Sequence, residues 1–154
     1  MKRVAETMIF GEILEGINYK ERQSVYGIIK NIKNEVALIK SPGGNFLPGG
    51  GIEKGESHEN CARREFLEET GHGVELDEYL GCGILYGLAP KQNKYLKIIG
   101  YFYLAELGEF IAAKTEEKNE MFWVDISMAV ETLKLQNQKW AMREYIKIYE
   151  RRKS

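Results

Sequence analysis

Residues 48–72 of the sequence read PGGGIEKGESHENCARREFLEETGH. Three consecutive glycines follow the first residue of this stretch, whereas residues 57–70 contain neither glycine nor proline. Ser57 is a favourable N-cap, because its hydroxyl can accept a hydrogen bond from an unpaired N–H group of the first helical turn. Gly71 can adopt the left-handed conformation that ends a helix. The stretch therefore predicts a helix over residues 57–70, about 21 Å long at about 1.5 Å per residue.

The acidic residues of this helix lie where a surface helix would not place them. Glu65, Glu68 and Glu69 are spaced i, i+3, i+4, so their carboxylates project from one face. At about 100° per residue, Ala62 and Phe66 fall beside that face and not opposite it. Carboxylates at the edge of a buried surface repel one another unless cations neutralise them. Oxygen ligands on a rigid element suit Mg²⁺ or Mn²⁺ better than zinc, so the pattern predicts a site for a hard divalent cation.

A simpler interpretation is a solvated acidic helix in which Arg64 pairs with Glu68. The spacing of the whole stretch argues against it. Gly50 is separated by five residues from Glu56, which is separated by seven residues from the run Arg64-Glu65-Phe66. One residue then separates Phe66 from Glu68-Glu69, and one more separates Glu69 from Gly71. This pattern resembles the signature of the Nudix hydrolases. The one departure is His72, where the family usually carries an aliphatic residue, and that position is a packing contact with little bearing on the chemistry.

The resemblance implies a fold and an activity. Nudix proteins fold as an α/β/α sandwich around a mixed β-sheet, and the similarity extends from about Val25 to Leu133. They hydrolyse a diphosphate linkage in a nucleoside diphosphate joined to another group, as in nucleoside triphosphates, dinucleoside polyphosphates and nucleotide sugars. The reaction requires a divalent metal, so Mg²⁺ or Mn²⁺ is the expected cofactor and a small nucleotide-type molecule the expected partner.

The resemblance also assigns roles to residues of this chain. The metal ligands that it implies are Glu65, Glu68, Glu69 and a backbone carbonyl of the Gly49–Gly50 turn. Arg64 corresponds to the family arginine that orients one of these glutamates, and Glu56 supports the loop or a metal through water. Glu68 is also a candidate catalytic group, because the identity of the general base varies among relatives. Gly50, Gly51 and Lys91 are the expected substrate contacts.

A fourth carboxylate outside the helix is expected to activate the attacking water. The acidic segment 116–120 precedes a strand that carries Trp123, where relatives place such a residue. Glu117 is the preferred candidate because it is farther from the strand and can move, with Glu120 next. The alternative is a solvated charged loop with no catalytic role.

Length and composition limit the other functions. A chain of 154 residues fits one domain over residues 1–154. Its net charge of −1 gives no basic field of the kind that binds nucleic acid. Between Gly50 and Glu78, however, the sequence contains nine acidic residues and three basic ones, so an anionic substrate would need bridging cations there.

Cysteine usage and the N-terminus favour a cytoplasmic protein. Cys61 and Cys82 are too few for a disulfide framework or a zinc site, and Cys61 is expected to be a small buried thiol. Met1-Lys2-Arg3 is not followed by a long apolar run, so neither a signal peptide nor membrane association is expected.

The rest of the chain predicts strands around this helix, with a helix at the end. Residues 1–22 are expected to form an accessory strand, over Thr7–Leu14, or a contact between two copies in a homodimer. The other expected strands are Gln23–Asn31, Glu35–Lys40, Val74–Leu76, Leu80–Tyr86, Tyr95–Leu104 and Glu120–Val124. A short helix is expected over Ile126–Leu133, capped by Asp125 or Ser127, and a longer one over residues 137–152.

Three other functions are compatible with parts of the sequence. A catalytically silent Nudix-like domain could sense nucleotides, although binding alone does not require the complete set of carboxylates. An isomerase of isoprenoid diphosphates shares the architecture, but Cys61 lies within the motif helix and not where such chemistry needs a cysteine. A purely structural domain would gain no thermal stability from Mg²⁺.

Overall fold

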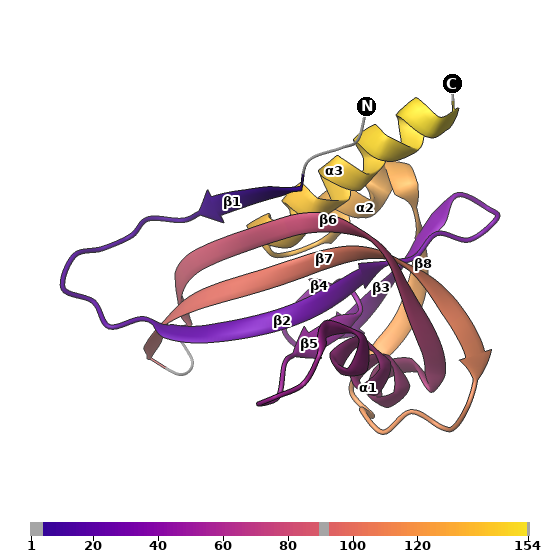
Figure 1. The fold of residues 1–154 in the computed structure, drawn as a ribbon, viewed down its shortest axis with the longest axis horizontal. Helices are drawn as coiled ribbons and strands as arrows, with labels where there is room; N and C mark the ends of the chain where they lie inside the picture. The colour runs from indigo at the N-terminus through magenta and orange to yellow at the C-terminus, as the bar shows by residue number, and fades with distance from the viewer. Residues whose placement is uncertain (1–4, 90–92, 154) are drawn as a thin grey trace.

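The computed structural model describes residues 5–89 and 93–153, which form strands and helices in a mixed order (Figure 1). In chain order the elements are β1 (Glu6–Phe10), β2 (Lys20–Ile28), β3 (Glu35–Ser41), β4 (Gly44–Phe46), β5 (Gly49–Gly51), α1 (His58–Thr70), β6 (His72–Ala89), β7 (Lys94–Phe110), β8 (Glu120–Asp125), a 3₁₀ turn (Ile126–Met128), α2 (Ala129–Thr132) and α3 (Gln136–Lys153).

The strands form two sheets that lie between helices. The larger sheet has the order β1-β6-β7-β2-β5, and the smaller one has the order β4-β3-β8. Both β1 with β6 and β2 with β7 are parallel pairs, whereas β6 and β7 are antiparallel. Figure 1 shows α1 on one side of the strands and α2 and α3 on the other. The predicted α/β/α arrangement around a mixed sheet is therefore confirmed.

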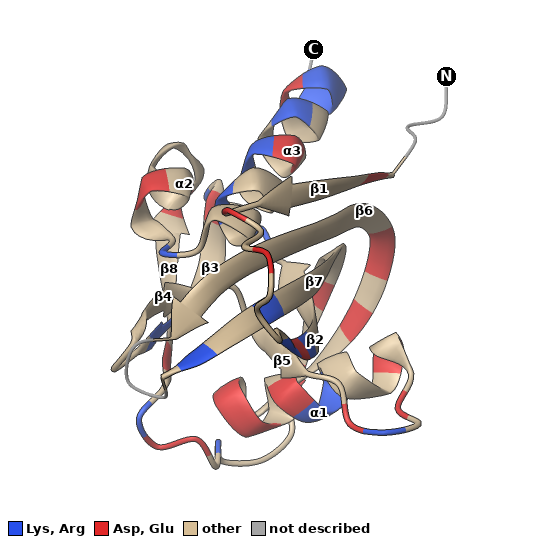
Figure 2. Cartoon of the chain, turned by 90° about the vertical axis from the view of Figure 1, so that its left-hand side faces the viewer, with Lys and Arg blue, Asp and Glu red and all other residues tan. Residues whose placement is uncertain are grey.

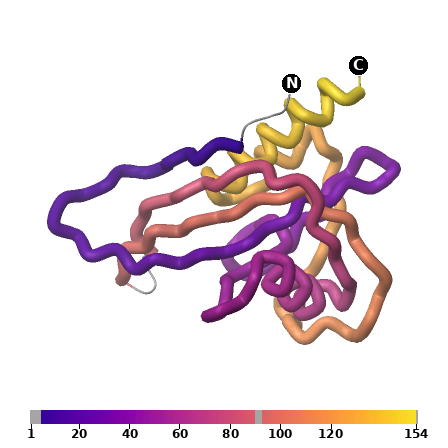
Figure 3. The backbone as a smooth tube through the Cα atoms, viewed as in Figure 1, coloured from indigo at the N-terminus to yellow at the C-terminus, as the bar shows by residue number. Residues whose placement is uncertain are grey.

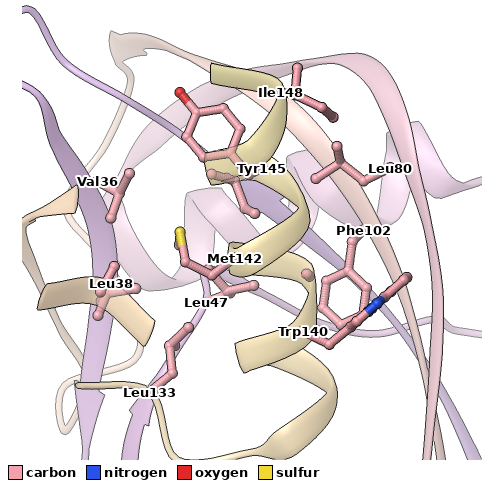
Figure 4. Close-up of a cluster of buried hydrophobic side chains, with 13 residues drawn as sticks. Val36, Leu38, Leu47, Leu80, Phe102, Leu133, Trp140, Met142, Tyr145 and Ile148 are labelled. Atoms are coloured by element: carbon pink, nitrogen blue, oxygen red, sulfur yellow. The ribbon is translucent and has the colours of Figure 1, made fainter. Parts of the chain in front are cut away.

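Two separate hydrophobic clusters hold the layers together. The cluster under α3 includes Trp140, Met142, Leu80 and Phe102, which Figure 4 shows between the helix and the strands. The cluster under α1 is built around Phe66, whose side chain is fully buried. Burying apolar surface on both faces of the strands stabilises each helix in a defined position.

Strand β2 contributes to both clusters because side chains alternate along a strand. Val25 belongs to the cluster under α1, and a side chain at Gly27 would meet the Phe66 ring. Tyr26 and Ile28 belong to the cluster under α3 instead. One strand therefore positions the motif helix with one set of residues and faces the opposite layer with the other.

The motif helix has nearly the predicted bounds. Ser57 is its N-cap and accepts a hydrogen bond from the Asn60 N–H group at 3.1 Å. Gly71 ends the helix in the left-handed conformation, with φ of 77°, and its N–H group donates to the Leu67 carbonyl. The long C-terminal helix is also confirmed, one residue longer at each end than predicted.

The predicted strands after the motif helix were too short. The expected strands Val74–Leu76 and Leu80–Tyr86 are one strand, β6, and its partner β7 runs well past Leu104 to Phe110. Figure 3 shows the two as a long curved hairpin. The register shifts at three places, between residues 72 and 74, 76 and 79, and 79 and 81. The irregularities let the polar residues between Leu76 and Leu80 stay in the strand. The apolar pattern is interrupted there, but the strand continues.

Three shorter predictions also need correction. The N-terminal strand ends at Phe10 and not at Leu14, because the Leu14 N–H group donates to the Tyr19 hydroxyl and leaves the sheet. Strand β2 begins at Lys20 and ends at Ile28. The segment expected as one helix over Ile126–Leu133 is a 3₁₀ turn followed by one short α-helical turn, with Asp125 as the cap.

The glycine-rich segment, expected as a turn, is a short strand. Gly49, Gly50 and Gly51 form β5, which pairs antiparallel with residues 24–26 of β2.

Cys61 and Cys82 are buried free thiols, as expected for Cys61. No helix in residues 5–89 or 93–153 combines the length and apolar character that crossing a membrane requires.

Candidate active site

The N-terminal part of α1 and the segment before it are joined by Arg64. Its Nε and Nη2 atoms donate to the two oxygens of Glu56 at 2.8 and 2.9 Å, a bidentate pair. Nη1 donates to Glu65 at 2.9 Å, and Nη2 also donates to the Gly51 carbonyl at 2.8 Å. The predicted contact with Glu68 is longer, at 3.6 Å. Arg64 therefore fixes the loop, the glycine strand and the first helix carboxylate relative to one another.

The pKa of Glu56 reflects this pairing. Hydrogen bonding from Arg64 lowers the pKa of Glu56 to about 2, with a smaller contribution from the Glu53 backbone N–H group. Glu56 is therefore a permanent anion at neutral pH. Its charge neutralises Arg64, so this single guanidinium offsets only part of the negative charge of Glu65 and Glu68, which it also contacts.

Glu69 is the most buried of the three predicted glutamate ligands, with 7% of its surface exposed. One of its oxygens, Oε1, accepts a hydrogen bond from the Gly49 N–H group at 2.9 Å. Burial raises the pKa of Glu69 to about 8; this hydrogen bond opposes the shift, and the charges of Glu65, Glu116 and Glu68 add to it. Burial likewise raises the pKa of Glu65. Two carboxyls thus lie where negative charge is poorly solvated.

The three glycines of β5 differ in what a side chain would meet. At Gly50 an added Cβ would overlap the carboxyl group of Glu65, so this carboxylate rests against the backbone. Gly49 has a φ of 137°, and a Cβ there would overlap the Val25 carbonyl oxygen. At Gly51 the nearest atom is the Gln23 carbonyl oxygen, at 3.9 Å. Glycine is therefore required by the backbone at Gly49, whereas a side chain at Gly50 would require the Glu65 carboxyl to move.

A pocket of about 290 Å³ opens beside Glu69 and Gly49, between β2, β3 and the start of α3. Its wall combines apolar side chains with a few polar ones. The lining residues are Arg22, Ser24, Tyr26, Ile39, Ser41, Phe46, Leu47, Gly49, Glu69, Ile98, Asn119 and Leu135. A small-molecule site usually has this mixture. The pocket was not predicted from the sequence, although polar Ser24 in the expected strand Gln23–Asn31, with Arg22 two positions before it, was a usable signal.

The donor atoms present suit a hard divalent cation. Within residues 5–89 and 93–153, no three acidic, histidine or cysteine side chains converge into a ready-made cage. Mg²⁺ does not need one, because proteins usually hold it through one or two carboxylates together with water and substrate phosphates. The poorly solvated carboxyl of Glu69, with Glu65 and Glu68 one turn away or less, is the arrangement that such a cation would stabilise. The residues therefore fit the expected metal.

Figure 2 shows the acidic residues gathered on α1 and on the adjoining part of β6. The predicted site residues Arg64, Glu65, Glu68, Glu69, Gly49, Gly50 and Gly51 are brought together there, as the contacts above show. Lys91 lies outside the described residues. In the part of the chain that the structure describes, the side chains of Glu117 and Glu120 form no hydrogen bond or ion pair.

Glu116 lies in the loop segment that contacts the end of α1. The backbone N–H groups of Thr115 and Glu116 both donate to the Glu68 carbonyl, at 2.9 and 3.0 Å. The charge of Glu116 contributes to the raised pKa of both Glu65 and Glu69. No feature of the sequence separates Glu116 from Glu117, because the way the loop closes on the end of α1 decides which of the two charges acts on the helix carboxylates.

Comparison with known proteins points to one family. A family model described as the NUDIX domain matches residues 20–147. Nudix hydrolase 4 of Arabidopsis thaliana is 29% identical over 130 residues, which are 84% of this chain and 59% of that protein. The 8-oxo-(d)GTP phosphatase of Mycolicibacterium smegmatis is 28% identical over 117 residues, 73% of this chain and 34% of that protein. The chain thus spans less than two thirds of the length of these curated relatives.

Solved structures agree on the fold. A NUDIX hydrolase from Nitrosomonas europaea superposes with a TM-score of 0.65 at 20% identity, covering 82% of this chain and 88% of that one. The MutT protein from Methanosarcina mazei Go1 gives 0.64 at 23% identity, covering 87% and 99%. Because the matched residues 20–147 include the whole motif helix and all strands except β1, the chain belongs to the Nudix hydrolase family.

Proposed function

We propose that the protein is a metal-dependent pyrophosphohydrolase that cleaves a diphosphate linkage in a nucleoside triphosphate or a related nucleotide. The observation that carries the proposal is the buried carboxyl of Glu69. It lies at the junction of two features, the carboxylates arranged by Arg64 and a pocket of about 290 Å³. The pocket supplies room for a nucleoside, and the carboxylates lie where its phosphates would emerge.

The size of the pocket favours a substrate with one nucleoside. Ligand pockets for drug-sized molecules span roughly 300–1,000 Å³, so this one lies at the lower limit. A second nucleoside, as in a dinucleoside polyphosphate, would have to remain outside it. The relative named as an 8-oxo-(d)GTP phosphatase supports the inclusion of oxidised guanine nucleotides among the candidates.

Different residues of the site have different proposed roles in the reaction. Arg64 holds the Glu65 carboxylate in place, and Glu65, Glu68 and Glu69 supply the oxygens that would hold Mg²⁺ or Mn²⁺. Such a cation neutralises phosphate charge and lowers the pKa of an attacking water when it is bound. Glu116 is the proposed carboxylate that accepts the proton of this water, since its backbone is bonded to the end of α1 and its charge acts on Glu69.

A hydrolysis panel tests the proposal. It compares (d)NTPs, oxidised dGTP, ADP-ribose, diadenosine polyphosphates and nucleotide sugars, with phosphate and nucleotide products separated by chromatography. Release of a nucleoside monophosphate with Mg²⁺ or Mn²⁺, and none after chelation, is the expected result. Binding of a nucleotide without any turnover would favour the sensing domain instead.

Replacing Arg64 by lysine is expected to lower kcat by about 10–100-fold, the range typical of residues that support metal ligands. Lysine keeps the charge but cannot bind Glu56 through two parallel hydrogen bonds while contacting Glu65 and the Gly51 carbonyl. The measurement is steady-state kinetics at saturating Mg²⁺, with Arg63→Lys as a matched control. Among the described residues, the guanidinium of Arg63 bonds with exposed Glu75 alone. Near-wild-type turnover in Arg64→Lys would contradict the positioning role.

Replacing Gly50 by alanine is expected to lower activity by about 10–100-fold with little loss of stability. The added methyl group displaces the Glu65 carboxyl, which is the end of a flexible side chain and can move without distorting the backbone. Gly51→Ala is the matched control, since its methyl group would meet only ordinary contacts. Equal activity of the two variants would show that the position of Glu65 does not limit the reaction.

A further inference from the structure

One face of α1 meets the glycine strand β5 at regular intervals. Cys61, Glu65 and Glu69 are spaced four residues apart, so they lie along the same side of the helix. Glu69 accepts a hydrogen bond from the Gly49 N–H group, and the Glu65 carboxyl rests against Gly50. Cys61 is the third member of this row, and the proposed chemistry gives it no role.

The thiol of Cys61 is enclosed between the helix and β5. No part of the residue is exposed to solvent. Its Sγ atom lies 3.4 Å from the Gly50 carbonyl oxygen and 3.5 Å from that of Gly51. Carbonyl oxygens only accept hydrogen bonds, and a buried thiol keeps its proton at neutral pH. The thiol therefore donates to the carbonyl groups of β5, which share its single proton.

Arg64 reaches the same strand from one turn further along the helix. Its Nη2 atom donates to the Gly51 carbonyl at 2.8 Å and lies 3.9 Å from the Cys61 sulfur. Nη1 of the same guanidinium donates to Glu65 at 2.9 Å. The Gly51 carbonyl thus accepts from two side chains of α1, and Cys61 supports the strand at the point where Arg64 connects it to Glu65.

The length of the side chain explains why Cys61 can set the distance between the two elements. Cysteine has one heavy atom beyond Cβ, so a contact of 3.4 Å with a main-chain oxygen brings the two backbones close together. Glutamate side chains are longer and more flexible. A change in the separation at Cys61 would therefore shift the glycines of β5 relative to the carboxyl groups of Glu65 and Glu69.

We propose that Cys61 is a positioning residue, whose thiol fixes the separation of β5 and α1 and thereby places Glu65 and Glu69 for binding of a divalent cation. The inference rests on the proposed function, in which these glutamates bind Mg²⁺ or Mn²⁺. It assigns the sulfur a role as a hydrogen-bond donor, and neither a covalent nor a redox step is involved.

Hydrogen exchange at Gly49 tests the inference in the metal-free protein, because this N–H group joins the strand to the helix. Measured by NMR, exchange of the Gly49 amide is expected to be about 5-fold faster in Cys61→Ala, the effect of about one hydrogen bond. Cys61→Ser keeps a donor and is expected to stay within about twofold of wild type. Cys82→Ala is the matched control, since Cys82 is also a buried free thiol but forms no hydrogen bond in the described part of the chain.

Mn²⁺ affinity tests the consequence for the site. Electron paramagnetic resonance of the free ion, titrated with metal-free protein, gives Kd without any turnover. Cys61→Ala is expected to bind Mn²⁺ about 10-fold more weakly, the lower end of the range for groups that support metal ligands. Cys61→Ser and Cys82→Ala should keep the wild-type Kd within about twofold. A role in packing alone would weaken the serine variant as much as the alanine variant.

Failure of the inference differs from failure of the proposed function. Equal Mn²⁺ affinity in Cys61→Ala and wild type, or an equal loss in Cys61→Ser, overturns the inference and leaves the enzyme assignment standing. A protein that hydrolyses no nucleotide but keeps the difference in Mn²⁺ affinity contradicts the proposed function alone, and a wild type that binds no Mn²⁺ overturns both. If the alanine variant does not fold, Cys61→Val, which also lacks a donor, takes its place.

Discussion

Glu69→Gln is expected to abolish most of the activity while making the metal-free protein more stable at pH 8. Glutamine can still accept the hydrogen bond from the Gly49 N–H group through its carbonyl oxygen. It removes a charge that is nearly excluded from water and surrounded by other carboxylates. Loss of an electrostatic group at a reaction centre typically costs about 10²–10³-fold in kcat. Function and stability should therefore change in opposite directions.

The pH dependence of stability gives an independent measure of the same charge. The ordinary pKa of this carboxyl is 4.5, and in the folded protein it is about 8. Between these values the folded state keeps a proton that the unfolded state has lost. Stability therefore falls as pH rises through this window. Urea unfolding at pH 5 and pH 8 should show the fall in wild type and a smaller one in Glu69→Gln.

Mg²⁺ provides the control for this prediction. A cation that binds the folded state raises the melting temperature, and it should do so more for wild type than for Glu69→Gln at pH 8. A variant that is less stable than wild type at pH 8 without metal would contradict the view that Glu69 is an uncompensated charge.

Glu116→Gln is expected to lower kcat by about 10²–10⁴-fold, the range for removal of a general base. The loop that carries Glu116 is held to the end of α1 by two backbone hydrogen bonds to the Glu68 carbonyl. The backbone of this loop is therefore held next to the helix that carries the proposed metal ligands. The measurement is kcat at saturating substrate and Mg²⁺ across pH, where loss of a base should also remove the acidic limb of the profile.

Glu117→Gln and Glu120→Gln are the matched comparisons, because both remove one charge from the same segment. The sequence favoured Glu117, and that prediction survives if its variant loses the most activity. Variants at all three positions within a few-fold of wild type would return the role of base to the glutamates of α1.

The sequence was sufficient to predict where the motif helix begins and ends and that it packs against the strands. Ser57 and Gly71 act on the backbone within one turn of themselves, so local chemistry sets where α1 begins and ends. Strand lengths were harder to predict, since the polar residues between Leu76 and Leu80 remain in β6 only because of pairing with β7. That pairing is a tertiary contact, so the residue pattern along β6 alone does not predict the length of the strand.

In the candidate site, too, some residues could be predicted from the sequence and others only from the structure. The charge and spacing on α1 were visible in the sequence, and the structure brings those residues together through Arg64. The choice of Glu116 depends on how a loop more than forty residues away closes on α1.

The alternation of side chains along β2 has a consequence for how such a protein can diverge. Val25 and Gly27 face the motif helix, and changing either would disturb the packing of Phe66. Ser24 and Tyr26, on the opposite face of the same strand, line the pocket. A duplicated gene could therefore acquire a new substrate through substitutions at every second codon of one short segment, while the codons between them keep the catalytic helix in its ancestral position.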